Sequence, residues 1–219
     1  MQQNEGFFDL IINSLKYSVS NVSALLIGGL VVILSSVLIG LPFLLGYVTR
    51  CGRQILKGNN VMPEWEGIGE LFKDGMMVLA IGLLYALITG LLYAFATVFL
   101  TFGDLAGSDI LVALGILIFI PSVIVAIVLG LLFYLSWVVY AVTGDIMKAL
   151  NPVNGLKLGL KNPIGYIIAL IATWIIGLIL FFPGLLIVTS PWLGIISATT
   201  GAYIYARYYQ KTAADGVKI

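Results

Sequence analysis

The residues that could perform chemistry are few, and most of them lie in one polar stretch. Four carboxylates follow one another there: Glu64, Glu66, Glu70 and Asp74. Carboxylates can bind hard cations such as Ca²⁺, but their spacing does not match the EF-hand loop. The interleaved Trp65, Ile68, Leu71 and Phe72 are instead typical of an amphipathic turn at a membrane surface. We therefore expect no metal site in this stretch.

No other side chains form a recognisable catalytic group. The sequence contains no histidine and a single cysteine, Cys51. The spacings typical of phosphate-binding loops, serine hydrolases, zinc proteases and dithiols do not occur. Arg50 and Arg53 could lower the pKa of the Cys51 thiol, although a small inert residue near a helix end is the commoner role. The residues predict that the chain is not an enzyme and carries no cofactor or metal.

The composition indicates a chain surrounded by lipid. It is 61% hydrophobic and 10% charged, with a mean hydropathy of +1.11, whereas soluble proteins are about 45–50% apolar and about 25% charged. The net charge of +1 does not indicate nucleic-acid binding, which requires an excess of clustered Lys and Arg. Residues 1–6 contain no basic residue, so we expect no cleavable signal peptide.

Four uncharged runs are long enough for membrane spans, which need about 20 apolar residues. They cover residues 22–49, 76–102, 110–144 and 163–206. The last run is too long for one helix and is expected to break at Pro183 and again at Pro191, because proline interrupts helical hydrogen bonding. The first run has two interpretations: a hairpin that turns near Pro42, or one helix with a kink at that residue.

The distribution of charge favours the hairpin. Short cytoplasmic loops carry an excess of Lys and Arg. With a hairpin, all 11 basic residues fall on one side, whereas a single kinked helix misplaces Lys16. The opposite side then holds only Asp104 and Asp109. We predict an all-α, polytopic bundle of about six membrane segments, or five with a kinked first helix, in the cell (plasma) membrane with both termini cytoplasmic.

This organisation makes residues 1–219 one integral membrane domain. An amphipathic helix is expected near the N-terminus, because Phe8, Ile12 and Leu15 recur at helical spacing and such a helix can lie at the headgroups. The predicted segments are an interfacial helix at 1–21, a first hairpin at 22–57, a cytoplasmic loop at 58–75, a second hairpin at 76–144, a cytoplasmic interfacial segment at 145–162, a third hairpin at 163–209 and a tail at 210–219.

An internal repeat is one interpretation of the two ends of the chain. Three residues, Asn13, Lys16 and Asn21, match Asn154, Lys157 and Asn162 at one constant offset, and at that offset Pro42 matches Pro183. A true repeat would place two copies in the same orientation, about an axis along the membrane normal. The other interpretation is a chance alignment within apolar sequence of low complexity.

A packing face is predicted on the last apolar segment. Small residues with helical spacing allow two helices to approach closely in lipid. The candidate residues are Gly194, Ser197, Ala198, Gly201 and Ala202. The partner helix would be another span of this chain or the same helix in a second copy. Replacement of Ile195, if it faces lipid, is expected to have little effect.

A group of residues around the first polar loop also carries a family resemblance. It comprises Gly46-Tyr47, Arg50, Arg53, Pro63-Glu64-Trp65 and the stretch 69–75, with Asn162-Pro163 and Tyr166 further on. This pattern resembles a prokaryotic membrane-protein family, domain of unknown function 4013. The likeness covers about residues 8–209. It implies the same layout of apolar segments and brings no established activity or catalytic residues.

These observations favour a non-enzymatic structural or accessory membrane component. The soluble portion is small, because the longest polar stretch is too short to hold a core of its own. Its expected partners are membrane lipids and either a second copy or a larger membrane complex, and no nucleic acid. The alternative is a carrier or channel for a small neutral or apolar solute, which the proline-broken helices and the possible repeat suggest. A lipid-handling enzyme is a third hypothesis.

Overall fold

A computed structural model describes residues 5–186 and 188–214, and within these ranges every regular element is a helix. The all-α prediction is therefore confirmed for the described chain. Part of the predicted tail at 210–219 belongs to the last helix, and residues 215–219 lie outside the described ranges, as do residues 1–4 of the N-terminal segment. The helices are α1 Phe7–Ser18, α2 Val22–Ser35, α3 Leu41–Leu56, α4 Ile68–Leu105, α5 Asp109–Thr143, α6 Ile146–Leu150, α7 Pro152–Lys161, α8 Pro163–Gly184 and α9 Ser190–Ala214.

Side-chain caps explain where several helices begin. Asn21 accepts a hydrogen bond from the Ala24 N–H (3.1 Å) at the start of α2. Asn162 accepts one from the Gly165 N–H (2.9 Å) at the start of α8. Each cap satisfies a backbone donor that has no partner within its helix. These two asparagines are matched in the possible sequence repeat, so the repeat predicts the same local structure at both ends of the chain.

The packing of the two copies is nevertheless different. Helix α1 packs on α9, whereas its counterpart α7 packs on α5. An axis that related two equivalent copies would give both helices equivalent neighbours. Within the described residues, the two copies therefore have similar local structure, but they pack against different helices.

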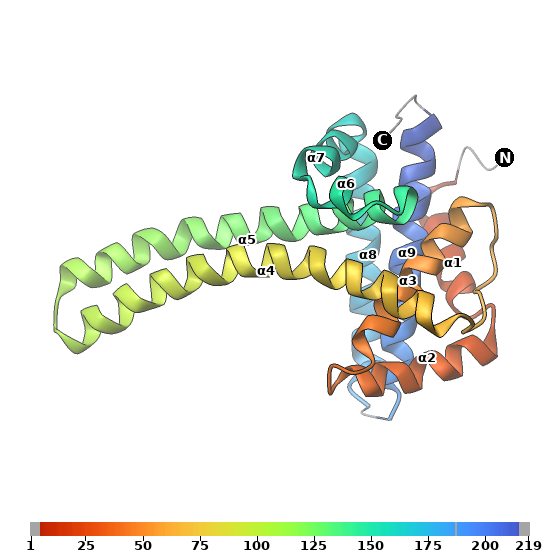
Figure 1. Ribbon diagram of the computed structural model, residues 1–219, viewed down its shortest axis with the longest axis horizontal. Helices are drawn as coiled ribbons and strands as arrows, with labels where there is room; N and C mark the ends of the chain where they lie inside the picture. The colour runs from red at the N-terminus through yellow and green to blue at the C-terminus, as the bar shows by residue number, and fades with distance from the viewer. Residues whose placement is uncertain (1–4, 187, 215–219) are drawn as a thin grey trace.

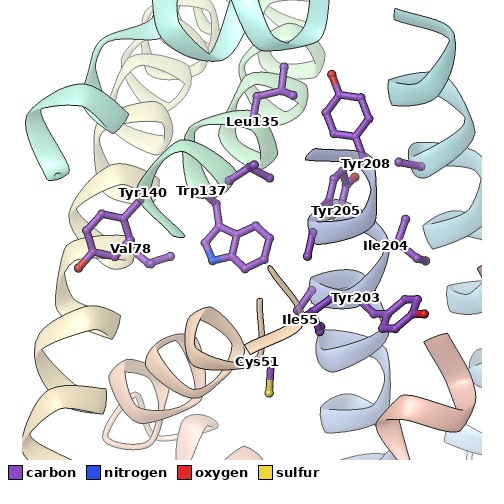
Figure 2. Close-up of a cluster of buried hydrophobic side chains, with 14 of the residues drawn as sticks. Cys51, Ile55, Val78, Leu135, Trp137, Tyr140, Tyr203, Ile204, Tyr205 and Tyr208 are labelled. Atoms are coloured by element: carbon purple, nitrogen blue, oxygen red, sulfur yellow. The ribbon is translucent and has the colours of Figure 1, made fainter. Parts of the chain in front are cut away.

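The helices form a bundle with one long projection (Figure 1). Helices α4 and α5 run side by side as a hairpin that extends far from the other helices, while α8 and α9 run across the direction of the hairpin. The core lies where the base of the hairpin meets α3 and α9. Figure 2 shows Trp137 of α5 pointing toward α3, near Cys51 and Ile55, beside the buried side chains of α9.

Two glycines bring α3 and α4 into backbone contact. A β-carbon at Gly46 would lie 1.8 Å from the carbonyl oxygen of Leu71, and one at Gly75 would lie 1.6 Å from that of Pro42. Real β-carbons do not approach backbone atoms this closely, so each position requires glycine. The first turns of α3 are thus fixed to the base of the hairpin.

The predicted number of membrane segments is not confirmed. Among the described residues, α4, α5 and α8 are long and apolar enough to cross a membrane, and a fourth span results if α1 and α2, bent by 84°, count as one. The first apolar region does turn at 36–40, with Leu38 at a φ of 66°. Its two arms, however, contain 14 and 16 residues, fewer than the roughly 20 that a bilayer requires. Helix α9 is long enough, but its tyrosines, hydroxyl residues and Arg207 make it too polar.

Candidate functional site

A polar pocket of about 660 Å³ opens between the end of α3, the following loop and the start of α4. All four carboxylates of the polar stretch line it, together with three cations from α3 and its C-terminal end. The lining residues are Arg50, Arg53, Gln54, Lys57, Pro63, Glu64, Glu66, Gly67, Gly69, Glu70 and Asp74. The pocket contains groups of both signs, and their pairing determines what it can bind.

Arg53 and Asp74 form the strongest of these pairs. The guanidinium donates from both terminal nitrogens to the two carboxylate oxygens, at 2.5 and 3.2 Å. Its Nε donates to the Ala141 carbonyl (3.2 Å), and Tyr140 donates its hydroxyl proton to Asp74 Oδ1 (2.7 Å). Charge-assisted bidentate pairs of this kind are short and geometrically specific. The network joins α3, α4 and α5 at the base of the hairpin.

Two aromatic rings connect the loop to the bundle. Tyr47 of α3 and Trp65 stack in parallel, with ring centres 3.9 Å apart and planes inclined by 4°. Tyr47 donates to the Pro63 carbonyl (2.7 Å), and the Trp65 indole N–H donates to the Ala24 carbonyl on α2 (2.8 Å). Both rings thereby bury their faces and satisfy their polar atoms. The loop is consequently well anchored at this end.

Of the remaining carboxylates, those of Glu70 and Glu64 each have one partner. Glu70 faces Arg50 at 3.5 Å, with 84% of its side chain exposed, and Arg50 also donates to the backbone carbonyl of Glu66. Glu64 accepts a hydrogen bond from the Asn21 amide (2.8 Å). No three potential metal ligands converge within the part of the chain that the structure describes. Most charges of the pocket are therefore engaged internally, and Glu66 and Lys57 are exposed.

The single thiol is inaccessible. Cys51 is completely buried, and Tyr17 and Tyr47 lie beside it. Loss of solvation raises the pKa of the Cys51 thiol to about 12, which outweighs the lowering effect of Arg50. Because the thiolate is the reactive form, this arrangement favours the inert interpretation of Cys51 over an activated nucleophile.

Several residues that line the pocket also carry the family resemblance, and they pair with one another: Arg50 lies beside Glu70, and Arg53 is paired with Asp74. Other residues of the resemblance join the same helices and loop, with Gly46 against Leu71 and Tyr47 stacked on Trp65. A family model described as protein of unknown function (DUF4013) matches residues 29–189. The chain belongs to the DUF4013 family. No curated protein and no solved structure matches it.

The DUF4013 match ends just before α9, which carries the predicted packing face. Within this face Ala202 is buried, and a β-carbon at Gly194 would lie 3.2 Å from Val32 Cγ1 on α2. Ser197, Ala198 and Gly201 are only partly covered, and no atom of another element lies within 4 Å of a β-carbon at Gly201. The structure thus brings part of the face against α2 and leaves the rest open.

Other residues make the tightest contacts of α9. Ile195, considered above as a lipid-facing position, is fully buried, because it sits against Gly28 of α2. Thr199 donates to Ser18 of α1 (2.9 Å). Sequence reasoning passed over Gly28, although the pair Gly28-Gly29 in an apolar helix is a signal for close approach.

Proposed function

We propose that this DUF4013 protein is an integral protein of the cell membrane with a structural or accessory role, and that it is not an enzyme. One observation carries the proposal: the α4–α5 hairpin projects from the bundle with apolar side chains on nearly all sides. Only 6% of the most apolar part of α5 is buried within the protein. The side chains that are more than half exposed include Leu83, Leu87, Leu91, Phe95, Leu117, Ile120, Ile124 and Ile127.

Such a surface is unfavourable in water. Exposed apolar area costs about 25 cal/mol per Å², and soluble monomers rarely expose a contiguous patch larger than a few hundred Å². In lipid the cost disappears, because the acyl chains are equally apolar. Apart from the position of Pro121 in α5, both helices satisfy their backbone hydrogen bonds internally, which hydrocarbon requires.

The dimensions of the hairpin suit an oblique crossing. Helices α4 and α5 have 38 and 35 residues and are about 57 and 52 Å long, whereas the hydrocarbon layer is about 30 Å thick. Both helices are therefore long enough to cross the layer with a tilt. The 22-residue α8 is about 33 Å long and would stand more upright.

The orientation follows from charge. Asp104 and Asp109 are at the tip of the hairpin, and the basic residues within the described ranges lie at its base and elsewhere on the bundle. Under the positive-inside rule the base faces the cytoplasm, together with both termini. Helix α1, whose Phe8 and Ile12 are exposed, would then lie at the cytoplasmic interface.

A non-enzymatic role is supported by the state of the polar groups. Most charges of the pocket are engaged in internal pairs, and the Cys51 thiol is buried. What the molecule offers to its surroundings is mainly helix surface, which suits contact with lipid and with a second copy or a larger membrane complex.

One feature favours a second candidate, a carrier for a small apolar solute. A groove of about 590 Å³ runs between α4 and α5, where Gly82, Gly90 and Gly130 leave space beside Tyr93 and Phe133. Its volume is in the range of small-molecule sites. Uptake of apolar solutes by vesicles with and without the purified protein would test this candidate.

Protease accessibility in intact cells tests the main proposal. We expect a cleavage site inserted between Gly103 and Asp109 to be cut from outside, and tags at both termini to be protected until the cells are opened. The chain should also remain in the membrane fraction after alkaline extraction. Release by alkali, or protection of the 103–109 site with an accessible terminus, would contradict it. Proteins that co-purify in mild detergent would then test the accessory role.

A further inference from the structure

Helices α6 and α7 carry a surface that nothing in the fold covers. Its apolar members are Met147, Val153, Leu156 and Leu160, which are 73%, 49%, 48% and 67% exposed. Three exposed lysines, Lys148, Lys157 and Lys161, lie along the same two helices. We call these seven residues the outer face of α6–α7. Apolar side chains with basic residues beside them are characteristic of helices that lie in the headgroup region of a membrane.

The opposite side of α7 holds it in place. Gly155, Leu158 and Gly159 are buried, and a β-carbon at Gly159 would lie 2.9 Å from Leu135 Cδ1 on α5. The two glycines allow α7 to lie almost directly on α5. Because this contact fixes the helix against the base of the hairpin, the outer face necessarily points away from the protein.

The charges of the outer face are not neutralised locally. Asp145 is the acidic residue nearest in the sequence, and its carboxylate caps α6 by accepting the N–H groups of Met147 (2.8 Å) and Lys148 (3.3 Å). Within the described residues, none of the three lysines pairs with a carboxylate. A surface of this charge is complementary to anionic lipids of the cytoplasmic leaflet.

Helix α1 provides an internal comparison. At the constant offset of the possible repeat, its buried Ser14, Tyr17 and Ser18 correspond to Gly155, Leu158 and Gly159. Its exposed Ile12 corresponds to Val153, at 48% and 49% exposure. Helix α1 therefore has the same amphipathic design, but Lys16 is its only cation and Asp9 is also exposed.

We propose that the outer face of α6–α7 lies in the headgroup region of the cytoplasmic leaflet and gathers anionic phospholipids around it. The proposal rests on the membrane location argued above. The apolar side chains set the depth of the segment, and the lysines select the headgroups. Each lysine near an anionic surface contributes about 1 kcal/mol, or roughly fivefold in lipid preference. An acidic protein partner is the competing occupant of this face.

Fluorescence quenching in vesicles tests the proposal. Val153→Cys carries an environment-sensitive fluorophore, and Ile12→Cys and Leu117→Cys carry it as references. Cys51 is buried and contributes little background. The full chain is reconstituted in phosphatidylcholine vesicles containing a small, equal proportion of nitroxide-labelled phosphatidylglycerol or labelled phosphatidylcholine. The label at 117 reports whether the hairpin inserts into the bilayer. The label at 153 reports which lipids surround the outer face, and the label at 12 gives the same information for α1, an interfacial helix without the cluster of lysines.

We expect label 153 to be quenched severalfold more strongly by labelled phosphatidylglycerol than by labelled phosphatidylcholine, and label 12 to show little preference. The K148Q/K157Q/K161Q variant should lose most of the preference at label 153. Its matched control, K16Q/K57Q/K73Q, replaces three exposed lysines on other elements and should retain it.

The outcomes separate this inference from the membrane proposal. Quenching at 117 with none at 153 would overturn the inference alone, and would leave the face to a protein partner. Equal quenching of label 153 by both lipids, or equal losses in the two triple variants, would overturn the selection of anionic lipid. Absence of quenching at 117 would overturn the membrane proposal and this inference with it.

Discussion

Asp74 at the start of α4 and Arg53 near the end of α3 form a two-pronged ion pair, with side chains only 19% and 29% exposed. The pair lies where the projecting hairpin joins the bundle, and Tyr140 of α5 adds a third hydrogen bond to the carboxylate. Partly buried charges depend on their partners, because removal of one partner leaves the other desolvated and unpaired. The Arg53–Asp74 pair therefore holds the hairpin on the bundle, and loss of either charge should destabilise the fold.

We expect Asp74→Asn to lower the free energy of unfolding by about 2–3 kcal/mol, because hydrogen bonds to charged groups are lost while Arg53 stays partly buried. Unfolding of the purified protein in mixed detergent micelles measures this. Replacement of Glu64, Glu66 and Glu70 together by Gln is the control, and it should leave expression, membrane insertion and folding intact, since exposed pairs contribute about 1 kcal/mol or less. A triple variant as unstable as Asp74→Asn would contradict this prediction.

The backbone contact between α3 and α4 gives a second prediction. Gly75→Ala places a methyl group 1.6 Å from the position of the Pro42 carbonyl oxygen, so the two helices must separate, at a cost of about 1–3 kcal/mol or more. The matched control is Gly90→Ala in the same helix, where a β-carbon meets no atom of another element within 4 Å. That change should be neutral or stabilising by about 0.5–1 kcal/mol, because alanine is the better helix former. Equal unfolding curves for the two variants would show that α3 and α4 are not in backbone contact.

The third prediction concerns the thiol. Because burial raises the pKa of Cys51 to about 12 from an ordinary value of 9.0, the thiolate fraction near pH 8 should be about a thousandfold smaller than for an exposed cysteine. Alkylation by maleimide should be very slow in the folded protein and fast after denaturation, as followed by mass spectrometry. Rapid labelling of the native protein would mean that this part of the core opens or that the thiol is activated.

Much of the local structure could be predicted from the sequence, because local rules set it. Helices α2 and α8 begin one residue after Asn21 and Asn162, and a turn near Pro42 separates α2 from α3. The number of spans could not be obtained in this way. An uncharged run limits where a helix can lie, but part of the first run forms the turn at 36–40 and leaves two short arms.

In the candidate site, too, some features could be predicted from the sequence and others depend on tertiary contacts. Its residues could be identified from their polarity and from the resemblance, yet their pairing depends on tertiary contacts. No periodicity links Arg53 to Asp74 or Tyr47 to Trp65, because the contacts arise from the way α3 crosses α4 at Gly46 and Gly75. Ile195 illustrates the limit on α9, where an apolar residue in an apolar helix could face lipid or a neighbouring helix, and only the position of α2 decides.

The last prediction tests that contact between α2 and α9. A β-carbon at Gly28 would lie 2.6 Å from Ile195 Cγ1, so Gly28→Ala should destabilise the protein by about 1–3 kcal/mol through overpacking. Ile195→Ala should cost about 2–5 kcal/mol by leaving a cavity. In the double variant the new methyl group enters that cavity, so the cost should be smaller than the sum by about 0.5–3 kcal/mol. Gly201→Ala, which meets no neighbouring element, is the control and should not destabilise the fold. Additive costs in the double variant, or a Gly201→Ala change as costly as Gly28→Ala, would show that α2 does not pack on α9 through this pair. In that case the oligomer size of Gly201→Leu would show whether the open part of the small-residue face contacts a second copy.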